Sequence, residues 1–451
     1  MIVKTAFYTG LCSVLFSANV FGADVQGARV VRGDWKTVDA AAFGLSPKAG
    51  ADVNAAALQK ALDGGRRVVK VSEPGTYDID RICLIDSDTE LVFGPGTRLR
   101  KAKPICVALA NRAAYCGGVD SNIVVRGLSF VVNGCEREAD PNGPAPGLQG
   151  HVSFFHVNDL EIRDFSCTDF LASQYCLQVV DFRGFTIDGF DIRGEKDGIH
   201  LNAGRDFVIR NGKLRTGDDG IAINAGEWPD FTPRMGSICD GLVENVHDLP
   251  GGRCNFARVI TGGWVQWHRG IRLQRNDLCN VGNNVYGVTP MPLGTNEYVS
   301  TTPPTHTHGV WKSPEGINFL FLQSDGVSRV NISNVTFRNV RMDCDRSIFC
   351  GWETYEWARL IHPELPRDRY PAIDVRLERV AKSAKGPIVF GNADANVAFA
   401  DCAAVDGRLL EMGWSSSRTL APRRRVVVDG VEQVFTNGTA CVKGALVAPR
   451  E

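Results

Sequence analysis

Three aspartates stand out because their spacing would bring carboxylates together. Asp197 is followed by a glycine, and Asp218 and Asp219 come 21 and 22 residues later, again followed by a glycine. Carboxylates that share one site repel each other, so at least one of them should have a raised pKa. A protonated carboxyl beside ionised ones supplies an acid and a base together. These residues are therefore the first candidates for acid–base chemistry.

A repeat of 22 residues is the feature that would stack these aspartates. The segment 177–198 aligns without a gap on 199–220, and the same register starts again at Ile221. The two segments share identical residues at the pairs Arg183/Arg205, Phe185/Phe207, Ile187/Ile209, Arg193/Arg215, Asp197/Asp219 and Gly198/Gly220. Such a period, with short runs of alternating apolar residues, is typical of a β-solenoid. Equivalent residues then lie one coil apart, about 4.8 Å.

The elements that would position the repeat are all short. The intervals between its apolar runs leave no room for crossover helices, so the sequence predicts an all-β, parallel β-helix. An amphipathic run over 53–62, with Asp52 as its predicted N-cap, indicates a short helix that covers the N-terminal end of the coils. Two stretches rich in Pro, Gly and aromatic residues, near 227–265 and 290–314, predict loop insertions.

Two passages of the chain resemble a known family of enzymes. DVNAAALQKALDGGRRVVKVSEPGTYDI, followed by DTELVFGPGTRL, looks like the opening of pectin-lyase-like right-handed β-helix proteins. The central EKDGIHL and VIRNGKLRTGDDGIAIN resemble glycoside hydrolase family 28, the polygalacturonases. The resemblance covers residues 34–225 and implies a single-stranded right-handed parallel β-helix, as one domain over 34–451. It also implies a secreted hydrolase of O-glycosyl bonds that acts in carbohydrate metabolism.

The family's motifs include Asn-Thr-Asp and, further along, Gly-Asp-Asp. Matched onto this chain, they imply that Asp197, Asp218 and Asp219 are the catalytic carboxylates. The resemblance further implies an inverting mechanism, in which Asp218 protonates the leaving oxygen while the other two hold the attacking water. The working pair of carboxyl groups in such enzymes is about 6.5 to 9.5 Å apart.

The chain departs from the family at three motifs. Asn-Thr-Asp reads Glu195-Lys196-Asp197, and the family's Gly-His-Gly and its uronate-binding Arg-Ile-Lys do not appear. The resemblance therefore implies a divergent member that acts on a pectic or related cell wall polysaccharide or oligosaccharide. The linkage, and cleavage inside the glycan or at its end, stay open.

Four other residues are candidates for contacts with the sugar. His200 alternates with two apolar neighbours and should face outward beside the aspartates. His268 is a candidate replacement for the family's missing histidine, and Arg272 and Lys312 are candidates to receive an acidic sugar. An ordinary surface position is the alternative for each. No Cys/His spacing indicates zinc, so we predict no metal and no cofactor.

Composition and the N-terminus point to an exported protein. The chain has 451 residues, of which 44% are hydrophobic and 22% charged, which fits a soluble fold. The formal net charge is -1, so no basic surface indicates nucleic acid as a partner. Residues 1–22 have the order of a signal peptide, a short cationic start, an apolar run and small residues, which predicts a secreted or periplasmic protein. No later run approaches a membrane span.

Two other functions are possible on the same scaffold. A polysaccharide lyase or epimerase would remove the proton beside a uronate carboxylate, often with Ca²⁺, which the pair Asp218-Asp219 could bind. A non-catalytic glycan-binding solenoid, such as an adhesin or a tailspike-like protein, would need no proton transfer. The products separate the three hypotheses, because a lyase leaves an unsaturated sugar, a hydrolase leaves a new reducing end, and a binding protein leaves neither.

Overall fold

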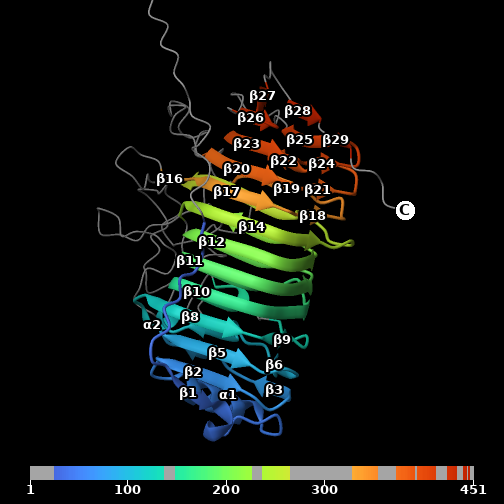
Figure 1. Ribbon diagram of the computed structural model, residues 1–451. Coiled ribbons are helices and arrows are strands. Elements are labelled where there is room, and N and C mark those ends of the chain that lie inside the picture. The colour runs from blue at the N-terminus through green and yellow to red at the C-terminus, as the bar shows by residue number, and fades with distance from the viewer. Residues whose placement is uncertain are drawn as a thin grey trace, which may run out of the picture.

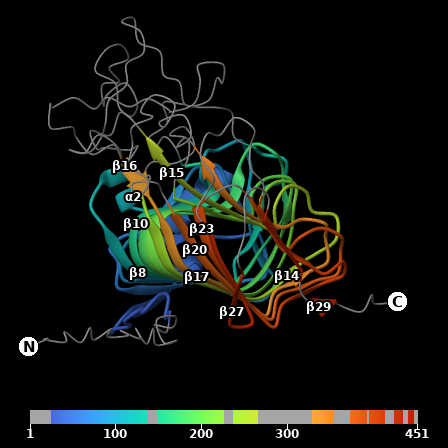
Figure 2. The same ribbon diagram turned by 90° about the horizontal axis from the view of Figure 1, so that it is seen from above.

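The chain winds into stacked coils whose strands belong to one sheet. The computed structural model describes residues 25–136, 148–225, 236–264, 328–353, 372–391, 394–412, 424–433, 440–443 and 445–446. Within these residues, nearly all pairings join a strand to the parallel strand of the next coil. Figure 1 shows the coils stacked in chain order, and Figure 2 shows them end-on around a common interior. The predicted fold, a single-stranded right-handed parallel β-helix, is confirmed.

The elements follow one another with short turns between them. The helices are η1 (Ala40–Phe43), α1 (Ala51–Leu62) and α2 (Ala113–Cys116). The strands of the first half are β1 (Lys36–Asp39), β2 (Arg67–Val71), β3 (Gly75–Ile79), β4 (Cys83–Ile85), β5 (Thr89–Phe93), β6 (Thr97–Lys101), β7 (Leu109–Asn111), β8 (Asp120–Arg126), β9 (Ser129–Val131), β10 (Gly150–Phe170), β11 (Tyr175–Gly194), β12 (Ile199–Thr216) and β13 (Ile221–Asn224). The strands of the second half are β14 (Ile238–Asp248), β15 (Ala257–Trp264), β16 (Ser328–Val330), β17 (Ile332–Arg338), β18 (Arg341–Met342), β19 (Ile348–Glu353), β20 (Ala372–Glu378), β21 (Ala381–Lys382), β22 (Val389–Gly391), β23 (Asp394–Ala400), β24 (Ala403–Ala404), β25 (Arg408–Met412), β26 (Arg424–Val428), β27 (Val431–Gln433), β28 (Ala440–Lys443) and β29 (Ala445–Leu446).

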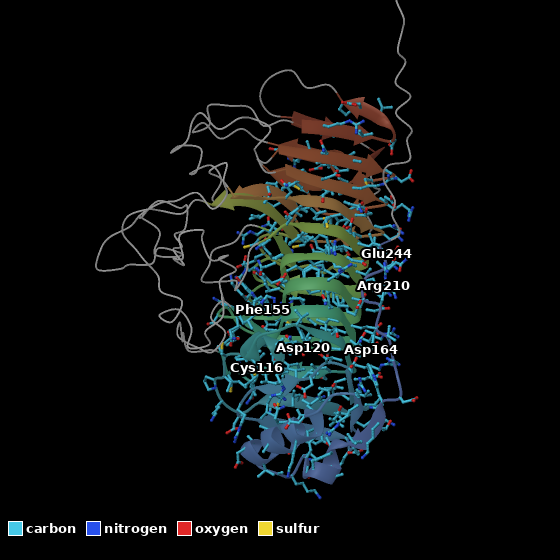
Figure 3. All side chains as sticks on the ribbon, turned by 90° about the vertical axis from the view of Figure 1, so that its left-hand side faces the viewer. Cys116, Asp120, Phe155, Asp164, Arg210 and Glu244 are labelled. Atoms are coloured by element: carbon cyan, nitrogen blue, oxygen red, sulfur yellow. The ribbon has the colours of Figure 1, made fainter. Side chains whose placement is uncertain are left out.

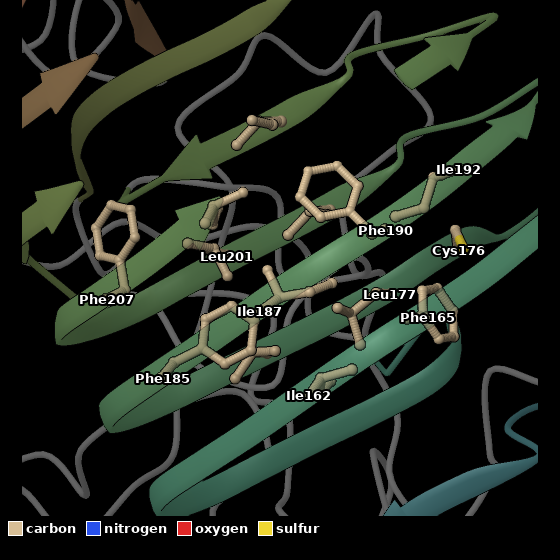
Figure 4. Packing of buried hydrophobic residues seen from close by; sticks show 14 of the residues in the cluster. Ile162, Phe165, Cys176, Leu177, Phe185, Ile187, Phe190, Ile192, Leu201 and Phe207 are labelled. Carbon is tan, nitrogen blue, oxygen red and sulfur yellow. The ribbon is translucent and has the colours of Figure 1, made fainter. Parts of the chain in front are cut away.

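The repeat seen in the sequence sets the register of the central coils. Leu177 of β11 pairs with Ile199 of β12, which pairs with Ile221 of β13, so equivalent residues recur every 22 positions. The apolar residues of this repeat point inward, as Figure 4 shows for Phe185, Phe207 and their neighbours. Together with residues of the other coils they form one buried hydrophobic cluster that extends through the stack.

Several coils after β13 are longer because they carry insertions. Gly204 of β12 pairs with Ile238 of β14, and Ile221 pairs with Ala257 of β15, so the offsets rise to 34 and 36 residues. The loop predicted over 227–265 is wrong for β14 and β15, which are strands of the sheet. The sequence signal failed there because an insertion changes the period and hides the alignment. The loop predicted near 290–314 lies outside the described residues.

The N-terminal end of the stack is covered by α1, as Figure 1 shows. The helix begins at Ala51, and its buried Leu58 and Leu62 pack into the core. Its N-cap is Gly50, and Asp52 lies in the first turn, so the predicted N-cap is wrong. A carboxylate in that turn still interacts favourably with the positive end of the helix dipole.

A segment outside the coils, residues 25–33, crosses several of them, and we call it the N-terminal strap. Backbone N–H groups of Gln26 and Gly27 donate to Oδ1 of Asp206 at 3.1 and 2.8 Å. Further along, the N–H groups of the strap bond three acceptors that belong to earlier coils, which are Thr186 Oγ1, Asp159 Oδ1 and Asn122 Oδ1. Each acceptor comes from a different coil, so the strap ties neighbouring coils together.

Charged residues also alternate along one outer column, part of which Figure 3 shows with Arg210 and Glu244. The paired registers place opposite charges one coil apart along Arg163, Asp188, Arg210, Glu244, Arg338 and Glu378. Ion pairs join several of these neighbours, for example Arg338 with Glu244 at 3.3 Å. Partly exposed pairs of this kind contribute about 0 to 1 kcal/mol each to the free energy of folding, so this column of ion pairs adds little to stability.

Candidate active site

The three aspartates lie in the turns that precede two neighbouring strands. Asp197 comes just before β12, and Asp218 and Asp219 come between β12 and β13. The N–H of Gly198 donates to the carbonyl of Asp219 at 2.9 Å, which fixes the two turns one coil apart. One oxygen of each carboxylate lies within 4.8 Å of the other two. The predicted convergence of the three carboxylates is therefore confirmed.

This spacing is closer than the resemblance implied. The carboxyl groups of an inverting pair usually stand about 6.5 to 9.5 Å apart, whereas here the three oxygens lie within 4.8 Å of one another. A close approach of the turns contributes, because a Cβ at Gly198 would lie 2.6 Å from the carbonyl oxygen of Gly220. The short spacing strengthens the mutual repulsion of the carboxylates.

Asp219 is buried and has a raised pKa. Its residue is 1% exposed. Burial, together with the charges of Asp197 and Asp218, raises the pKa of Asp219 to about 7. Arg258 at 3.5 Å and the side-chain amide of Asn255, which donates to Oδ1 at 2.7 Å, act in the opposite direction. Asp219 is thus half protonated near neutral pH.

Asp218 has the opposite shift because a lysine contacts it. Its side chain is 29% exposed, and Nζ of Lys196 pairs with Oδ2. Partial burial acts to raise the pKa of Asp218, but the hydrogen bond and charge of Lys196 outweigh it and lower the pKa. Of these two carboxylates, Asp219 therefore binds a proton more readily in the free protein, whereas the resemblance assigned the donor role to Asp218. The cause is the departure from Asn-Thr-Asp that places a lysine beside this carboxylate.

His200 contacts the group but is not exposed. Its Nδ1 lies 2.7 Å from Oδ2 of Asp197, and its ring stacks on Tyr175 with 4.0 Å between ring centres. The predicted place beside the aspartates is confirmed, but the residue is 0% exposed, so the predicted surface position is wrong. Tyr175 covers the ring, and in this arrangement His200 orients Asp197 rather than meeting a sugar.

Several partners of the carboxylates were missed by the sequence reasoning. Lys196 was noted only as a departure, and Asn255 and Arg258 were not singled out. The pairing of Ala222 with Arg258 places this arginine one coil beyond β13, and the 36-residue offset concealed that relation. The candidates His268, Arg272 and Lys312 lie outside the described residues.

Two cations thus face three carboxylates at this turn. In the described part of the chain, Asp197, Asp218 and Asp219 are also the one group whose spacing could hold a metal ion. The ammonium of Lys196 already lies against Asp218 and 3.9 Å from Asp197. The arrangement is therefore suited to proton transfer among carboxylates whose total charge is partly balanced by the chain itself.

Among the described residues, no helix is long and apolar enough to cross a bilayer.

Comparisons with known proteins find similarity in structure but not in sequence. No protein-family model matches the chain, and no curated protein matches it. Among solved structures, the family 28 exopolygalacturonase of Yersinia enterocolitica is 12% identical, with a TM-score of 0.42, and covers 87% of this chain and 78% of its own. The surface adhesin PfbA of Streptococcus pneumoniae is 10% identical, with a TM-score of 0.41, and covers 91% and 99%. The exopolygalacturonase of Thermotoga maritima is 11% identical, with a TM-score of 0.40, and covers 92% and 97%.

Proposed function

We propose that this protein is a glycoside hydrolase that cleaves glycosidic bonds in a pectic or related polysaccharide with inversion. The observation that carries the proposal is the convergence of three carboxylates within 4.8 Å, one with a raised and one with a lowered pKa. Titratable groups whose pKa values are driven apart are the usual arrangement for paired acid and base catalysis. The sequence motifs around Asp197 and Asp218-Asp219 name the reaction class. The inverting outcome rests on these motifs alone, because the short spacing of the carboxylate oxygens does not favour inversion.

The chemistry requires one proton to be delivered and one to be accepted. Asp218 is the most accessible carboxylate of the three, so it is the group that can meet the glycosidic oxygen. Asp219 and Asp197, which are both buried, hold the water that attacks the anomeric carbon. As the bond to the leaving oxygen breaks, that oxygen takes a proton from Asp218 and the water gives one to the buried pair.

Lys196 must release Asp218 for this to happen. Its side chain is 31% exposed and sits at the same surface as Asp218, so a bound acidic sugar can draw the ammonium away. Without that partner the pKa of Asp218 rises, and the proton held by Asp219 can pass to it. Asp219 then becomes the ionised base. The substrate itself would thus set the protonation pattern that the reaction needs.

The test is a screen of polygalacturonate, other acidic glycans and neutral glycans with two parallel readouts. New reducing ends are measured chemically, and unsaturated sugars are measured by ultraviolet absorbance. The matched control is the double variant Asp218→Asn/Asp219→Asn, which keeps the side-chain volumes. We expect reducing ends without unsaturated product, and NMR of the first product should show the inverted anomer.

Two other results would replace the proposal. Unsaturated product that depends on added Ca²⁺ would identify a lyase, and Lys196 would then have to leave the carboxylates to admit the ion. Retention of a glycan by both the wild type and the double variant, with no product, would identify a binding protein.

We also propose that the chain is exported and that residues 34–451 form one domain. The N-terminal order of a short cationic start, an apolar run and small residues supports export. Mass spectrometry of the protein from its native host should find an N-terminus near residue 23. An intact Met1 in a cytoplasmic fraction would contradict this.

A further inference from the structure

A buried arginine lies directly behind the turn that carries Asp218 and Asp219. Arg346 precedes β19, and its side chain is 1% exposed. Its Nη1 donates to the backbone carbonyl of Asp218 at 3.2 Å and to the hydroxyl of Thr216 at 2.7 Å. That hydroxyl in turn donates to the same carbonyl at 2.8 Å. The guanidinium therefore holds the peptide group that joins the two neighbouring carboxylates.

The same guanidinium also holds the turn of a following coil. Nη1 donates to the carbonyl of Arg253 at 3.1 Å, and Nε donates to Oδ2 of Asp248 at 3.3 Å. Nη2 pairs with the other oxygen of Asp248. This turn leads directly to Asn255, whose amide contacts Asp219. Arg346 thus joins the turn of the carboxylates to the segment that carries one of their partners.

The ion pair occupies a place that the repeat otherwise fills with apolar side chains. Asp248 pairs with Leu214 of the coil before and with Met342 of the coil after, and both of these belong to the core. Asp248 is 0% exposed. A buried ion pair contributes little to stability, because the loss of hydration offsets most of the attraction. A charged pair at a core position therefore calls for a role other than stabilisation.

Two glycines leave room for the guanidinium. A Cβ at Gly252 would lie 2.7 Å from Cζ of Arg346, and a Cβ at Gly220 would lie 3.2 Å from its Nη2. Gly220 directly follows Asp219, and a Cβ there would lie even closer to the backbone carbonyl oxygen of Phe256, at 2.6 Å, so Arg346 and the next coil together leave little room at the end of the Gly-Asp-Asp-Gly turn. The turn, Arg346 and Asp248 therefore pack against one another as one unit.

We propose that Arg346, held by Asp248, is a positioning residue that fixes the peptide between Asp218 and Asp219 so that the three carboxylates converge. The kinetic part of this inference rests on the proposed hydrolase function. The placement of the carboxylates can be measured without any substrate, so the two can fail separately.

The main variant is the double substitution Arg346→Met/Asp248→Leu, which removes both charges of this ion pair and keeps the backbone carbonyl of residue 346 that accepts from Nζ of the buried Lys382. A displacement of reacting groups by about 1 Å can cost about 100-fold in rate. We therefore expect kcat to fall by about 100-fold with little change in KM. Arg338→Met is the matched control, because it removes an arginine from an ion pair between coils at the outer surface. We expect this control to retain wild-type turnover.

A merely structural role of Arg346 would leave the titration of Asp219 unchanged. This titration, monitored by carboxyl ¹³C NMR in the free protein, is therefore the deciding measurement. We expect its midpoint to fall by at least about one unit in the double variant, because separated carboxylates repel each other less. An unchanged midpoint in the folded variant overturns the proposal. If the double variant does not fold, Arg346→Lys keeps the charge but loses the fork of donors, and the same titration decides. A lowered midpoint with no hydrolysis by the wild type would support the positioning role and end the proposed function.

Discussion

Two sets of aspartates lie in columns of this solenoid and have different roles. Asp159 and Asp206, on the side of the N-terminal strap, use their carboxylates to accept backbone N–H groups. Asp197 and Asp219 lie one coil apart in the two turns that carry Asp197 and Asp218-Asp219, which we call the acidic turns, and they instead face each other and Asp218. The spacing between coils is the same in both sets. What a carboxylate faces, a donor or another carboxylate, decides whether it ties the fold together or has an altered proton affinity.

Backbone conformation explains why aspartate occurs in the first set but not why it occurs in the second. Beneath the strap, one column contains the positions Asp88, Asn122, Asp159, Gly184, Asp206, Asp240 and Asn334, all of which have positive φ. Glycine, asparagine and aspartate tolerate that conformation better than other residues. None of Asp197, Asp218 and Asp219 has a positive φ. Local geometry thus gives no reason for aspartate at the acidic turns, which strengthens the case that their chemistry does.

The largest expected effect is on turnover, which should distinguish the two sets of aspartates. Asp218→Asn and Asp219→Asn should each lower kcat on the glycan found in the screen by at least about 100-fold, since general acid or base catalysis contributes about 10²- to 10⁴-fold. Asp206→Asn should leave kcat unchanged, because it keeps the acceptor and tolerates the positive φ. Wild-type turnover in both acidic-turn variants would remove the distinction on which the mechanism rests.

A second prediction concerns stability as a function of pH. The pKa of Asp219 is raised in the folded state, so its contribution to stability is full below its unfolded pKa near 4 and is lost as pH rises through about 7. Asp219→Asn should therefore be more stable than the wild type at pH 8, by on the order of 4 kcal/mol, since the shift is about three pKa units at about 1.4 kcal/mol per unit. The two proteins should converge at pH 4.

The control for that measurement is Asp218→Asn, for which the sign reverses. The pKa of Asp218 is lowered, so its ionised form stabilises the fold above the unfolded pKa, and this contribution disappears as pH falls. Denaturant unfolding of the three proteins at several pH values tests both signs. Parallel pH curves for all three would show that the carboxylates do not interact as the structure indicates.

The sequence predicted the coils well and the partners of the carboxylates poorly. The ungapped repeat was enough to stack Asp197 on Asp219, because β11 to β13 keep one register. Arg258 and Arg346 come from later coils, beyond insertions that change the period, so no alignment within the chain could place them. The burial of His200 beneath Tyr175 depends on stacking between coils, which alternation along one strand does not reveal.

A third prediction concerns Lys196, the residue that sets Asp218 apart from its neighbours. Lys196→Met removes the positive charge that favours ionisation of this carboxylate, so the pKa values of the acidic turns should rise. Both limbs of the pH–rate profile should move to higher pH by about one unit, which corresponds to about a 10-fold lower rate on the acidic side. Lys213→Met, at an ion pair with Asp191 on the outer surface, is the control. An unmoved profile would show that Lys196 is not coupled to the reacting carboxylates.

The smallest expected effect lies beneath the strap and tests whether the two regions are independent. Thr186 Oγ1 accepts the N–H of Ala28 at 2.9 Å, and the threonine is nearly buried. Thr186→Val keeps the shape but removes this acceptor, so the free energy of unfolding should fall by about 1 kcal/mol, the usual net value of one hydrogen bond. Thr186→Ser keeps the hydroxyl and serves as the control. Turnover of Thr186→Val should match the wild type, because the strap bonds only the outer side of the coils. A loss of turnover in Thr186→Val, and not in Thr186→Ser, would mean that the strap also holds the acidic turns in place, and the contrast between the two sets of aspartates would then be one of degree.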